Sequence, residues 1–316
     1  MTVLAALPSG SARRVVYLGT PEIAVRPLEA LVAAGVEVAL VITRIDKRRG
    51  RGSTVSPSPV KASAIALGIP VSHDLMDATS VGADLGVVVA YGRIIPVSVL
   101  TRIAMINVHF SLLPRWRGAA PVERALLEGD ARTGVCIMRV EEGLDEGEVF
   151  ARVPVTVRVD HTLTTLRNEL VEASIAPLVR AVTQGCGRGE PQSGTVVHAP
   201  KIAPGELQIH FTEPARTVVA KTRLENAWFV LADRRIRVVR AEEAPTNAPA
   251  SVVVSATSST PVTRVTPGTV LDTNRDGVLV MCADAPVLLA TVQPEGKSPM
   301  SAADWARGTR LPTSLA

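Results

Sequence analysis

The residue types that could do chemistry are concentrated between Asn107 and Gly118, where Asn-Val-His-Phe is followed by Ser-Leu-Leu-Pro-Arg-Trp-Arg-Gly. Residues 105–108 are predicted to form a strand, so Asn107 and His109 share a face and can project toward one site. Both side chains can donate to a carbonyl oxygen that gains negative charge, and His109 can also move a proton. The alternative is that the two side chains only satisfy backbone groups at the end of a strand.

An acidic turn with the sequence Glu-Gly-Leu-Asp-Glu-Gly occupies residues 142–147, after a predicted strand at residues 135–140. The glycines on both sides of Asp145 allow a tight excursion of the chain. A carboxylate at this place could orient His109 and stabilise its charged form. The alternative is a solvated acidic turn, and the distance between Asp145 and His109 decides between the two interpretations.

A basic segment occupies residues 43–52 and has a local net charge of +4, equal to the net charge of the whole chain. A loop of this kind can bind phosphates by releasing their counterions, and its glycines allow close approach of the backbone. The alternative is an ordinary solvated run of charges. The side chains predicted to contact a nucleic acid are Arg44, Lys47, Arg48, Arg49 and Arg51.

The composition excludes several classes of protein. With 47% hydrophobic residues and a net charge of +4 over 316 residues, the chain fits neither a disordered protein nor one that coats DNA. The three cysteines are far apart and form no Cys-x-x-Cys pair, which argues against a disulfide framework and a cysteine metal site. No apolar run approaches the roughly 20 residues that span a bilayer. We therefore expect a cytoplasmic protein without membrane or DNA partners.

The first half of the chain alternates short β-branched runs with longer helical stretches, which is typical of β-α-β units in a parallel sheet. Its first turn, Gly19-Thr20-Pro21-Glu22, lacks the Gly-x-Gly-x-x-Gly pattern, which disfavours NAD. The predicted strands are residues 15–18, 36–42, 85–90, 105–108 and 135–140. Two of the predicted helices are residues 59–67 and 163–183.

The pattern changes after a segment rich in glycine and proline, which we interpret as a linker. The predicted domains are therefore a catalytic domain at residues 1–184, a linker at 185–204 and a small β-barrel domain at 205–316. The last of these has short predicted strands and no long helix. Its predicted strands are residues 218–220, 228–231, 236–241, 268–271, 277–281 and 287–293.

Taken in order, the motifs resemble the methionyl-tRNA formyltransferase family, and the resemblance covers essentially the whole chain. It implies a Rossmann-like domain with a parallel sheet, a linker and an OB-like β-barrel that binds tRNA. The Asn-x-His, Ser-Leu-Leu-Pro and later Asp are shared by all folate-dependent formyltransferases, and the Arg-Trp-Arg-Gly-Ala-Ala-Pro continuation narrows the resemblance to the tRNA branch. The matching segments are residues 18–21, 50–52, 57–61, 87–92, 106–109, 111–121, 133–135 and 143–147.

The resemblance implies a formyl donor, 10-formyltetrahydrofolate, an acceptor, initiator Met-tRNA, and a monomer. No metal is expected, because formyl transfer to an amine requires charge stabilisation and proton movement and the sequence has no His/Cys ligand cluster. It implies that Asn107 and His109 hold the oxyanion of the tetrahedral intermediate. Asp145 would orient His109 and take the proton of the attacking amine. The residues implied to line the folate pocket are Ser111, Leu112, Leu113 and Pro114, together with Val88, Val89, Ala90 and Tyr91.

Three segments depart from the family pattern. Phe110 stands where a small residue, often Gly, follows the catalytic His, and a bulky ring there could narrow the pocket. In the basic loop, Ile45 and Arg48 replace two prolines, which adds charge and removes stiffness. In the second domain, residues 223–228 replace a turn that normally contains two prolines.

Two other functions stay open from the sequence. A folate-dependent formyltransferase that acts on a nucleotide-linked amino sugar or a purine ribonucleotide would keep Asn107, His109 and Asp145 but would not need the basic loop. A non-catalytic module would hold folate or a nucleotide in the first domain and RNA in the second. The intact set of three catalytic residues argues against that module, and turnover with charged tRNA would exclude it.

Overall fold

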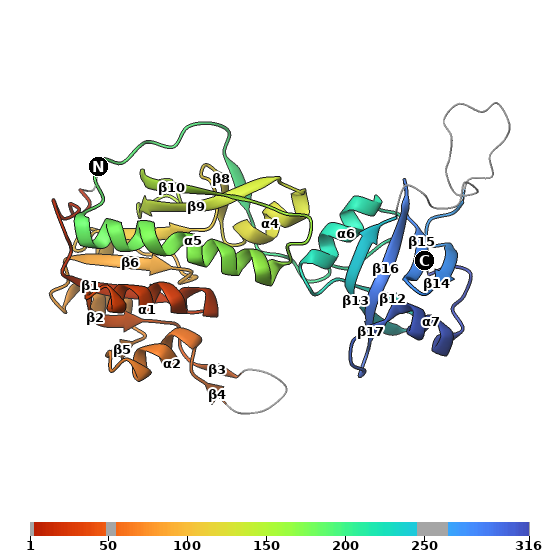
Figure 1. Ribbon diagram of the computed structural model, residues 1–316. Coiled ribbons are helices and arrows are strands. Elements are labelled where there is room, and N and C mark those ends of the chain that lie inside the picture. Colours follow the sequence, from red (N-terminus) through yellow and green to blue (C-terminus); the bar gives the residue numbers. More distant parts are fainter. Residues whose placement is uncertain (1–2, 49–54, 245–264, 316) are drawn as a thin grey trace. The chain divides into compact units, whose positions relative to one another are not determined.

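The computed structural model describes residues 3–48, 55–244 and 265–315, and the chain divides into two compact units (Figure 1). Unit 1 comprises Met1–Ala125, Ala131–Val159 and Thr165–Lys201. Unit 2 comprises Ile202–Ala316 together with two short pieces, Leu126–Asp130 and Asp160–Thr164. The candidate catalytic residues all belong to unit 1.

Unit 1 is built on a seven-stranded sheet in the order β10-β9-β7-β6-β1-β2-β5. The strands from β5 to β7 are parallel, whereas β9 is antiparallel to both β7 and β10. The strands are β1 (Arg14–Gly19), β2 (Glu37–Ile42), β5 (Val71–Ser72), β6 (Leu85–Val89), β7 (Met105–His109), β9 (Arg132–Arg139) and β10 (Val149–Thr156).

Helices cover the sheet because its central strands are apolar on both faces, as in β-α-β folds. In β1, Val15 and Tyr17 are as completely buried as Val16 and Leu18. An ion pair between Arg26 of α1 and Glu172 of α5 places these two helices on the same face of the sheet (Figure 1). The helices that lie wholly or mostly in unit 1 are α1 (Val25–Ala33), α2 (Pro59–Ala66), α3 (Val97–Leu100), α4 (Pro121–Glu128) and α5 (Leu163–Gln184), with 3-10 turns η1 (Glu22–Ala24) and η2 (Leu75–Thr79).

Most of the predicted elements of the first half are present, but the sheet is mixed rather than wholly parallel. The strand predicted at residues 135–140 is β9, and it is antiparallel to both of its neighbours. The connection from β9 to β10 is the short acidic turn around Asp145, and a short connection between adjacent strands forces them to be antiparallel. The fold of unit 1 is therefore Rossmann-like with an antiparallel edge.

Two short two-stranded sheets accompany the main sheet. Strands β3 (Lys47–Arg48) and β4 (Val55–Ser56) pair antiparallel. Strand β8 (Arg115–Gly118) pairs in parallel with β11 (Val197–Ala199), which lies in the segment expected to be a linker. Residues 185–201 thus contribute a paired strand to unit 1.

Unit 2 is an antiparallel sheet in the order β12-β13-β16-β15-β14, with β17 paired to β16 and two helices against it. Its core includes Phe229, whose ring makes edge contacts with Phe211 at 5.5 Å and with Trp305 at 6.1 Å. The elements are α6 (Ala215–Arg223), β12 (Trp228–Leu231), β13 (Arg234–Glu243), β14 (Val270–Asn274), β15 (Gly277–Met281), β16 (Pro286–Pro294), β17 (Met300–Ser301) and α7 (Ala302–Thr309).

One predicted strand of the second half is wrong, because residues 218–220 lie within helix α6. The short run Thr-Val-Val-Ala has β-branched residues, but three or four apolar residues cannot distinguish a strand from a buried helix turn. Pro214 precedes the helix, and Asp284 accepts the backbone N–H of Ala215 in its first turn. The remaining sheet agrees with the expected all-β character of the second domain.

Within the described ranges, no helix combines the length and the apolar character needed to cross a membrane.

Candidate active site

Asn107 and His109 lie at the end of β7, in the middle of the sheet. By strand register, Asn107 is flanked by Val88 of β6 and Met138 of β9. His109 is 4% exposed, whereas Asn107 is only partly buried. The side-chain amide of Asn107 has no hydrogen-bond partner among the described residues. An unpaired amide donor therefore stands two residues before a buried imidazole on the same face of one strand.

Asp145 reaches this imidazole from the turn between β9 and β10. Its backbone is in the left-handed region, with φ 52°, between Gly143 and Gly147. Its Oδ2 lies 3.5 Å from Nδ1 of His109 and accepts a 2.8 Å hydrogen bond from the backbone N–H of Gly118. The acidic turn is thus at contact distance from His109, and the solvated-turn interpretation does not describe it.

The second ring nitrogen of His109 also faces an oxygen. Nε2 lies 2.8 Å from the carbonyl oxygen of Trp116, on strand β8. Because a carboxylate and a carbonyl both accept, the doubly protonated ring can donate to both sides at once. The backbone of β8 therefore touches both His109, through the Trp116 carbonyl, and Asp145, through the Gly118 N–H.

The loop from Ser111 to Pro114 is tied to the strand that follows it. Ser111 is fully buried and its Oγ donates to the carbonyl oxygen of Arg115 at 2.6 Å. Leu113 packs in a small cluster with Cys136 and Met138, and the peptide bond before Pro114 is cis. Leu112 covers Gly134, where an added Cβ would lie 2.6 Å from the leucine Cδ2.

The second predicted folate segment, residues 88–91, spans the end of β6. Val88, Val89 and Tyr91 are buried, and Ala90 between them has a φ of 47°. The hydroxyl of Tyr91 is buried without a hydrogen-bond partner in the described structure, and the ring belongs to the core cluster of the sheet. Thr20 donates through Oγ1 to the Tyr91 carbonyl at 3.3 Å, so the turn after β1 serves to join adjacent strand ends.

Phe110, which departs from the family pattern, is 6% exposed. Its ring is therefore almost wholly withdrawn from solvent.

The basic segment is described in part. Arg44 is partly buried, and its backbone N–H donates to Thr20 Oγ1 at 3.4 Å. Lys47 and Arg48 form β3, while Arg49 and Arg51 lie outside the described residues. The one carboxylate of the segment, Asp46, forms an ion pair with Lys61 of α2 at 2.5 Å.

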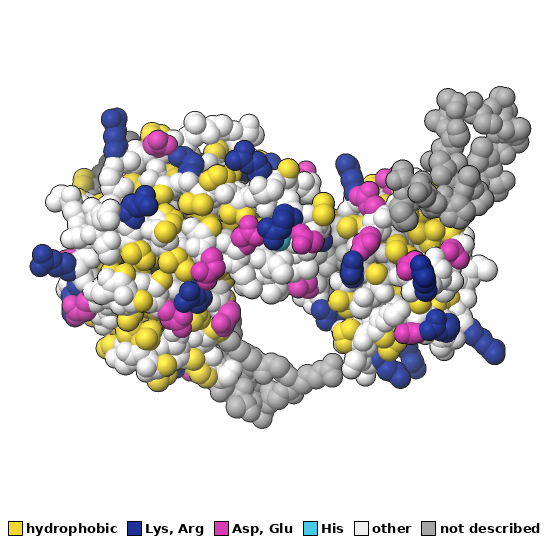
Figure 2. Space-filling model, viewed as in Figure 1, with side chains coloured by type: hydrophobic (Ala, Val, Ile, Leu, Met, Phe, Trp, Pro, Cys, Tyr) yellow, Lys and Arg dark blue, Asp and Glu magenta, His cyan; other side chains and the backbone are white. Residues whose placement is uncertain are grey.

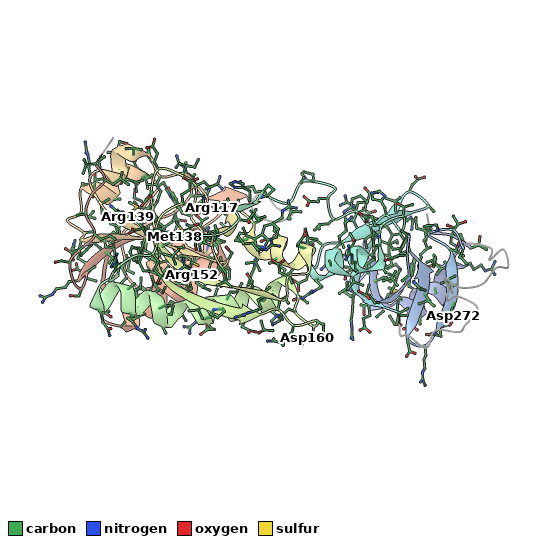
Figure 3. All side chains as sticks on the ribbon, turned by 90° about the horizontal axis from the view of Figure 1, so that it is seen from above. Arg117, Met138, Arg139, Arg152, Asp160 and Asp272 are labelled. Atoms are coloured by element: carbon green, nitrogen blue, oxygen red, sulfur yellow. The ribbon has the colours of Figure 1, made fainter. Side chains whose placement is uncertain are left out.

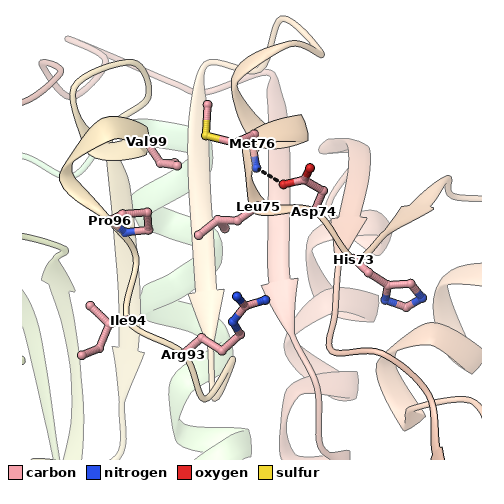
Figure 4. Close-up of a pocket in the computed structure, with 8 residues that line it drawn as sticks. All are labelled: His73, Asp74, Leu75, Met76, Arg93, Ile94, Pro96 and Val99. Carbon is pink, nitrogen blue, oxygen red and sulfur yellow. Dashed lines mark hydrogen bonds between the residues drawn. The ribbon is translucent and has the colours of Figure 1, made fainter.

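A pocket of about 560 Å³ lies beyond the ends of β5 and β6 (Figure 4). Arg93 and Leu75 project into the same space, and His73 Nδ1 lies 3.0 Å from the carbonyl oxygen of Thr43. None of the predicted catalytic or folate residues lines this pocket. Its lining residues are His73, Asp74, Leu75, Met76, Arg93, Ile94, Pro96 and Val99.

Two side chains to which the sequence assigned no role contact the Asp145 turn. Gln192 donates through Nε2 to the carbonyl oxygens of Asp145, at 2.8 Å, and Gly147, at 2.9 Å. Arg117 donates to Gln192 Oε1 and pairs with Glu146 at 3.2 Å. Gln192 lay in a segment expected to be a linker, so no sequence pattern indicated its contact.

Charged groups of both signs alternate over the face of the protein shown in Figure 2. Among the side chains that the structure describes, no group of three or more His, Cys, Asp or Glu residues could hold a metal ion.

Comparisons with known proteins agree with this architecture. Residues 13–182 match the formyl transferase family and residues 201–310 match the formyl transferase C-terminal domain. The chain is 38% identical to methionyl-tRNA formyltransferase of Roseobacter denitrificans, over 94% of this chain and 96% of that protein. It is 40% identical to methionyl-tRNA formyltransferase of an Arthrobacter species, over 93% of this chain and 96% of that protein.

Solved structures share the fold at low sequence identity. The N-formyltransferase of Helicobacter canadensis, in complex with folinic acid and dTDP-3-aminofucose, has a TM-score of 0.61 at 13% identity and covers 88% of this chain and 98% of its own. HypX of Aquifex aeolicus, in complex with tetrahydrofolic acid, has a TM-score of 0.59 at 16% identity. The match covers 93% of this chain and 47% of HypX, so this chain spans about half of that protein. With both domains matched and two relatives above one-third identity over nearly their whole length, the chain belongs to the methionyl-tRNA formyltransferase family.

Proposed function

We propose that this protein transfers the formyl group of 10-formyltetrahydrofolate to the α-amine of methionine on initiator tRNA, in the cytoplasm and as a monomer. The observation that carries the proposal is the meeting of Asn107, His109 and Asp145 at the carboxyl end of β7. A partnerless amide donor beside a carboxylate-bound imidazole suits acyl transfer to an amine, where charge develops on a carbonyl oxygen.

The reaction balances without an added oxidant or reductant. The neutral amine attacks the formyl carbon, a new C–N bond forms, and the carbonyl oxygen becomes an oxyanion. The intermediate then collapses as the bond to N10 of the folate breaks, and the proton lost by the amine is returned to N10. The protein must therefore stabilise one negative charge and move one proton.

Asn107 and His109 supply the donors to the oxyanion in this proposal. The amide of Asn107 is already free to donate. Nε2 of His109 lies against the Trp116 carbonyl in the ligand-free chain, and the oxyanion replaces that neutral oxygen as its acceptor. The exchange is favourable because hydrogen bonds to a charged acceptor are roughly twice as strong as bonds to a neutral one.

Asp145 acts on the other side of the ring. Its Oδ2 lies 3.5 Å from Nδ1 of His109 and accepts the Gly118 N–H, while Oδ1 accepts no hydrogen bond from the described residues. We assign Oδ1, directly or through one water, to the proton of the attacking amine. The carboxylate thereby orients the imidazole and serves as the base.

The donor pocket is assigned to the segments that flank these residues. Ser111, Leu112, Leu113 and Pro114 follow His109, and Val88, Val89, Ala90 and Tyr91 span the end of β6, the strand adjacent to Asn107. Because Val89 and Tyr91 have buried side chains, their part in binding the folate is assigned to backbone groups. Val88 is the register partner of Asn107, so this wall stands next to the proposed oxyanion donor.

The distribution of charge supports tRNA as the molecule that carries the acceptor of the formyl group. Lys61 pairs with Asp46, the one carboxylate of the basic segment, and we assign Arg44, Lys47, Arg48, Arg49 and Arg51 to the phosphates of the tRNA. In unit 2, Arg235 and Arg237 of β13 alternate with the buried Ile236 and Val238, and Arg237 donates to Gln293. A bulge in the pairing with β16 leaves Arg240 exposed, where it pairs with Glu242. These arginines supply a second set of cations for the RNA backbone.

The proposal is tested by the rate of formyl transfer from 10-formyltetrahydrofolate to Met-tRNA, free methionine and a nucleotide-linked amino sugar. We expect turnover with Met-tRNA only, with kcat/KM that falls steeply as salt increases. We expect Asn107→Ala and Asp145→Ala each to reduce turnover about 10²–10³-fold. The matched control is Asn168→Ala, an exposed asparagine of α5. Wild-type rates in both site variants, or turnover of the amino sugar alone, would overturn the proposal.

A further inference from the structure

We propose that Gln192 is a positioning residue that holds the Asp145 carboxylate in its working place; this inference rests on the proposed function. Asp145 is the one member of the catalytic set that lies on a turn rather than on β7. Its distance to His109 therefore depends on whatever holds the turn. A catalytic group must be positioned to within a fraction of an ångström, because small displacements lower the reaction rate. Such a group therefore needs support from neighbouring residues.

The side chain of Gln192 binds the backbone of the turn. The side-chain amide donates to the carbonyl oxygens of both Asp145 and Gly147, at 2.8 and 2.9 Å. Asp145 is in the left-handed region, with φ 52°, and is not among the residues paired between β9 and β10. The two carbonyls of a strained turn thus have one side chain as their common donor.

Arg117 fixes the amide of Gln192 in the required orientation. Its Nε and Nη2 donate to Oε1 of Gln192 at 3.0 and 2.8 Å. Because an amide presents an oxygen on one side and an NH₂ on the other, an oxygen directed at the guanidinium leaves the NH₂ directed at the turn. Arg117 is itself only 11% exposed and also pairs with Glu146 of the same turn.

The segment that carries Gln192 is anchored on both sides of it. Glu190 exchanges two backbone hydrogen bonds with Val149 of β10 and pairs with Arg152 at 2.6 Å. Residues Val197–Ala199 pair with β8. Arg117 binds this segment at Gln192, and Arg152 binds it at Glu190. Both arginines are labelled in Figure 3 and belong to unit 1. Gln192 is thus held on a fixed strip of chain rather than on a free connection.

The geometry gives Asp145 two independent supports. Gly118 of β8 binds the carboxylate itself, while Gln192 binds the backbone of the same residue. Loss of Gln192 leaves the carboxylate attached at one point, so the turn can rotate and lengthen the 3.5 Å approach to His109. The expected consequence is a loss of turnover with little change in substrate binding, because no substrate contact is removed.

The test uses the full chain with Gln192→Met, which keeps the length of the side chain and removes its hydrogen bonds. A second variant, Gln192→Glu, keeps the acceptor for Arg117 but cannot donate to the turn. We expect both to reduce kcat about tenfold, with each KM within about twofold of wild type. The control is Gln184→Met, an exposed glutamine at the end of α5 that should not change kcat.

A double-mutant cycle with Asp145→Asn distinguishes positioning from a general structural effect. Asn tolerates the left-handed conformation and can still accept the Gly118 N–H, so this variant should fold. If Gln192 acts through Asp145, adding Gln192→Met to Asp145→Asn should change the single-turnover rate less than about twofold. Equal losses in both backgrounds, or wild-type kcat for Gln192→Glu, would overturn the inference. Full activity of Asp145→Asn would instead overturn the proposed function.

Discussion

The backbone N–H of Gly118 donates a 2.8 Å hydrogen bond to Oδ2 of Asp145, and the same oxygen faces the imidazole of His109. This contact joins strand β8 to the turn between β9 and β10. It places a backbone donor behind the carboxylate, where it stabilises the negative charge without adding a titratable group. The conformation of residue 118 therefore bears directly on the proposed base.

We expect Gly118→Ala to lower both stability and turnover. Gly118 has a φ of 123°, and an added Cβ would lie 2.9 Å from the carbonyl oxygen of Ala199 on the paired strand β11. The backbone must shift, which should lower the free energy of unfolding by about 1–3 kcal/mol and move the donor of Asp145. Urea unfolding and the formylation rate measure the two effects.

Gly194→Ala is the matched control for this prediction. Gly194 also has a positive φ, of 108°, but the nearest atom to an added Cβ is 3.9 Å away. It therefore carries the conformational cost without the close approach. If Gly118→Ala affected turnover no more than Gly194→Ala does, the contact between β8 and Asp145 would not matter for the reaction.

Gly134→Ala should impair the folate pocket through Leu112. A Cβ at residue 134 would clash with the carbonyl oxygen of Val153 and would lie 2.6 Å from Leu112 Cδ2. Leu112 must move, so we expect the KM for 10-formyltetrahydrofolate to rise more than kcat falls. Steady-state kinetics with varied folate checks this, with Gly10→Ala as control because its Cβ would meet no atom within 4 Å. An unchanged folate KM would remove Leu112 from the predicted pocket.

Lys221→Met should destabilise unit 2. Lys221 is buried in α6, and its ammonium donates to both carboxylate oxygens of Glu213, at 2.6 and 2.7 Å, and to the carbonyl of Gln208. Removing the ammonium leaves a partly buried carboxylate and a carbonyl unpaired, at a cost of about 1–3 kcal/mol. Thermal or urea unfolding followed by tryptophan fluorescence, to which Trp228 and Trp305 of unit 2 contribute, measures it. The exposed Lys297→Met should be neutral.

Cys282 should make the protein lose stability as the pH rises into the alkaline range. Burial, with smaller contributions from the negative charges of Asp284 and Glu213, raises the pKa of this thiol from 9.0 to about 12. The folded chain therefore favours the neutral thiol, and its contribution is complete below the unfolded pKa of 9.0 and lost as pH rises toward 12. Unfolding midpoints between pH 8 and about 11 should fall less steeply for Cys282→Ala than for wild type. Parallel slopes would contradict this prediction.

Much of unit 1 could be predicted from local patterns. Apolar runs bounded by turn residues placed β1, β2, β6 and β7 to within a residue or two. The two-residue period of a strand put Asn107 and His109 on one face without any tertiary information. The same local reasoning failed at residues 218–220, because a short β-branched run fits both a strand and a buried turn of helix α6.

Which segments lie next to one another could not be obtained in that way. Strand β9 has an ordinary apolar pattern, and nothing in that pattern states that it joins β7 in antiparallel orientation. The resemblance to a family indicated that Asp145 belongs with His109, but the 3.5 Å approach between them exists only in the folded chain.

The sequence by itself therefore determined the classes of chemistry that are available: an amide and an imidazole on one strand, a carboxylate between glycines, and a basic segment. Only the tertiary structure decided that Gly118 binds that carboxylate and that Gln192 binds the backbone carbonyl of the same residue, through contacts that span 27 and 47 residues of chain. Periodicity reports which side chains share a face of one element, because it follows from local backbone geometry. Contacts between distant segments follow instead from how whole elements pack. No local sequence pattern identifies the hydrogen-bond partner of a polar residue in a loop.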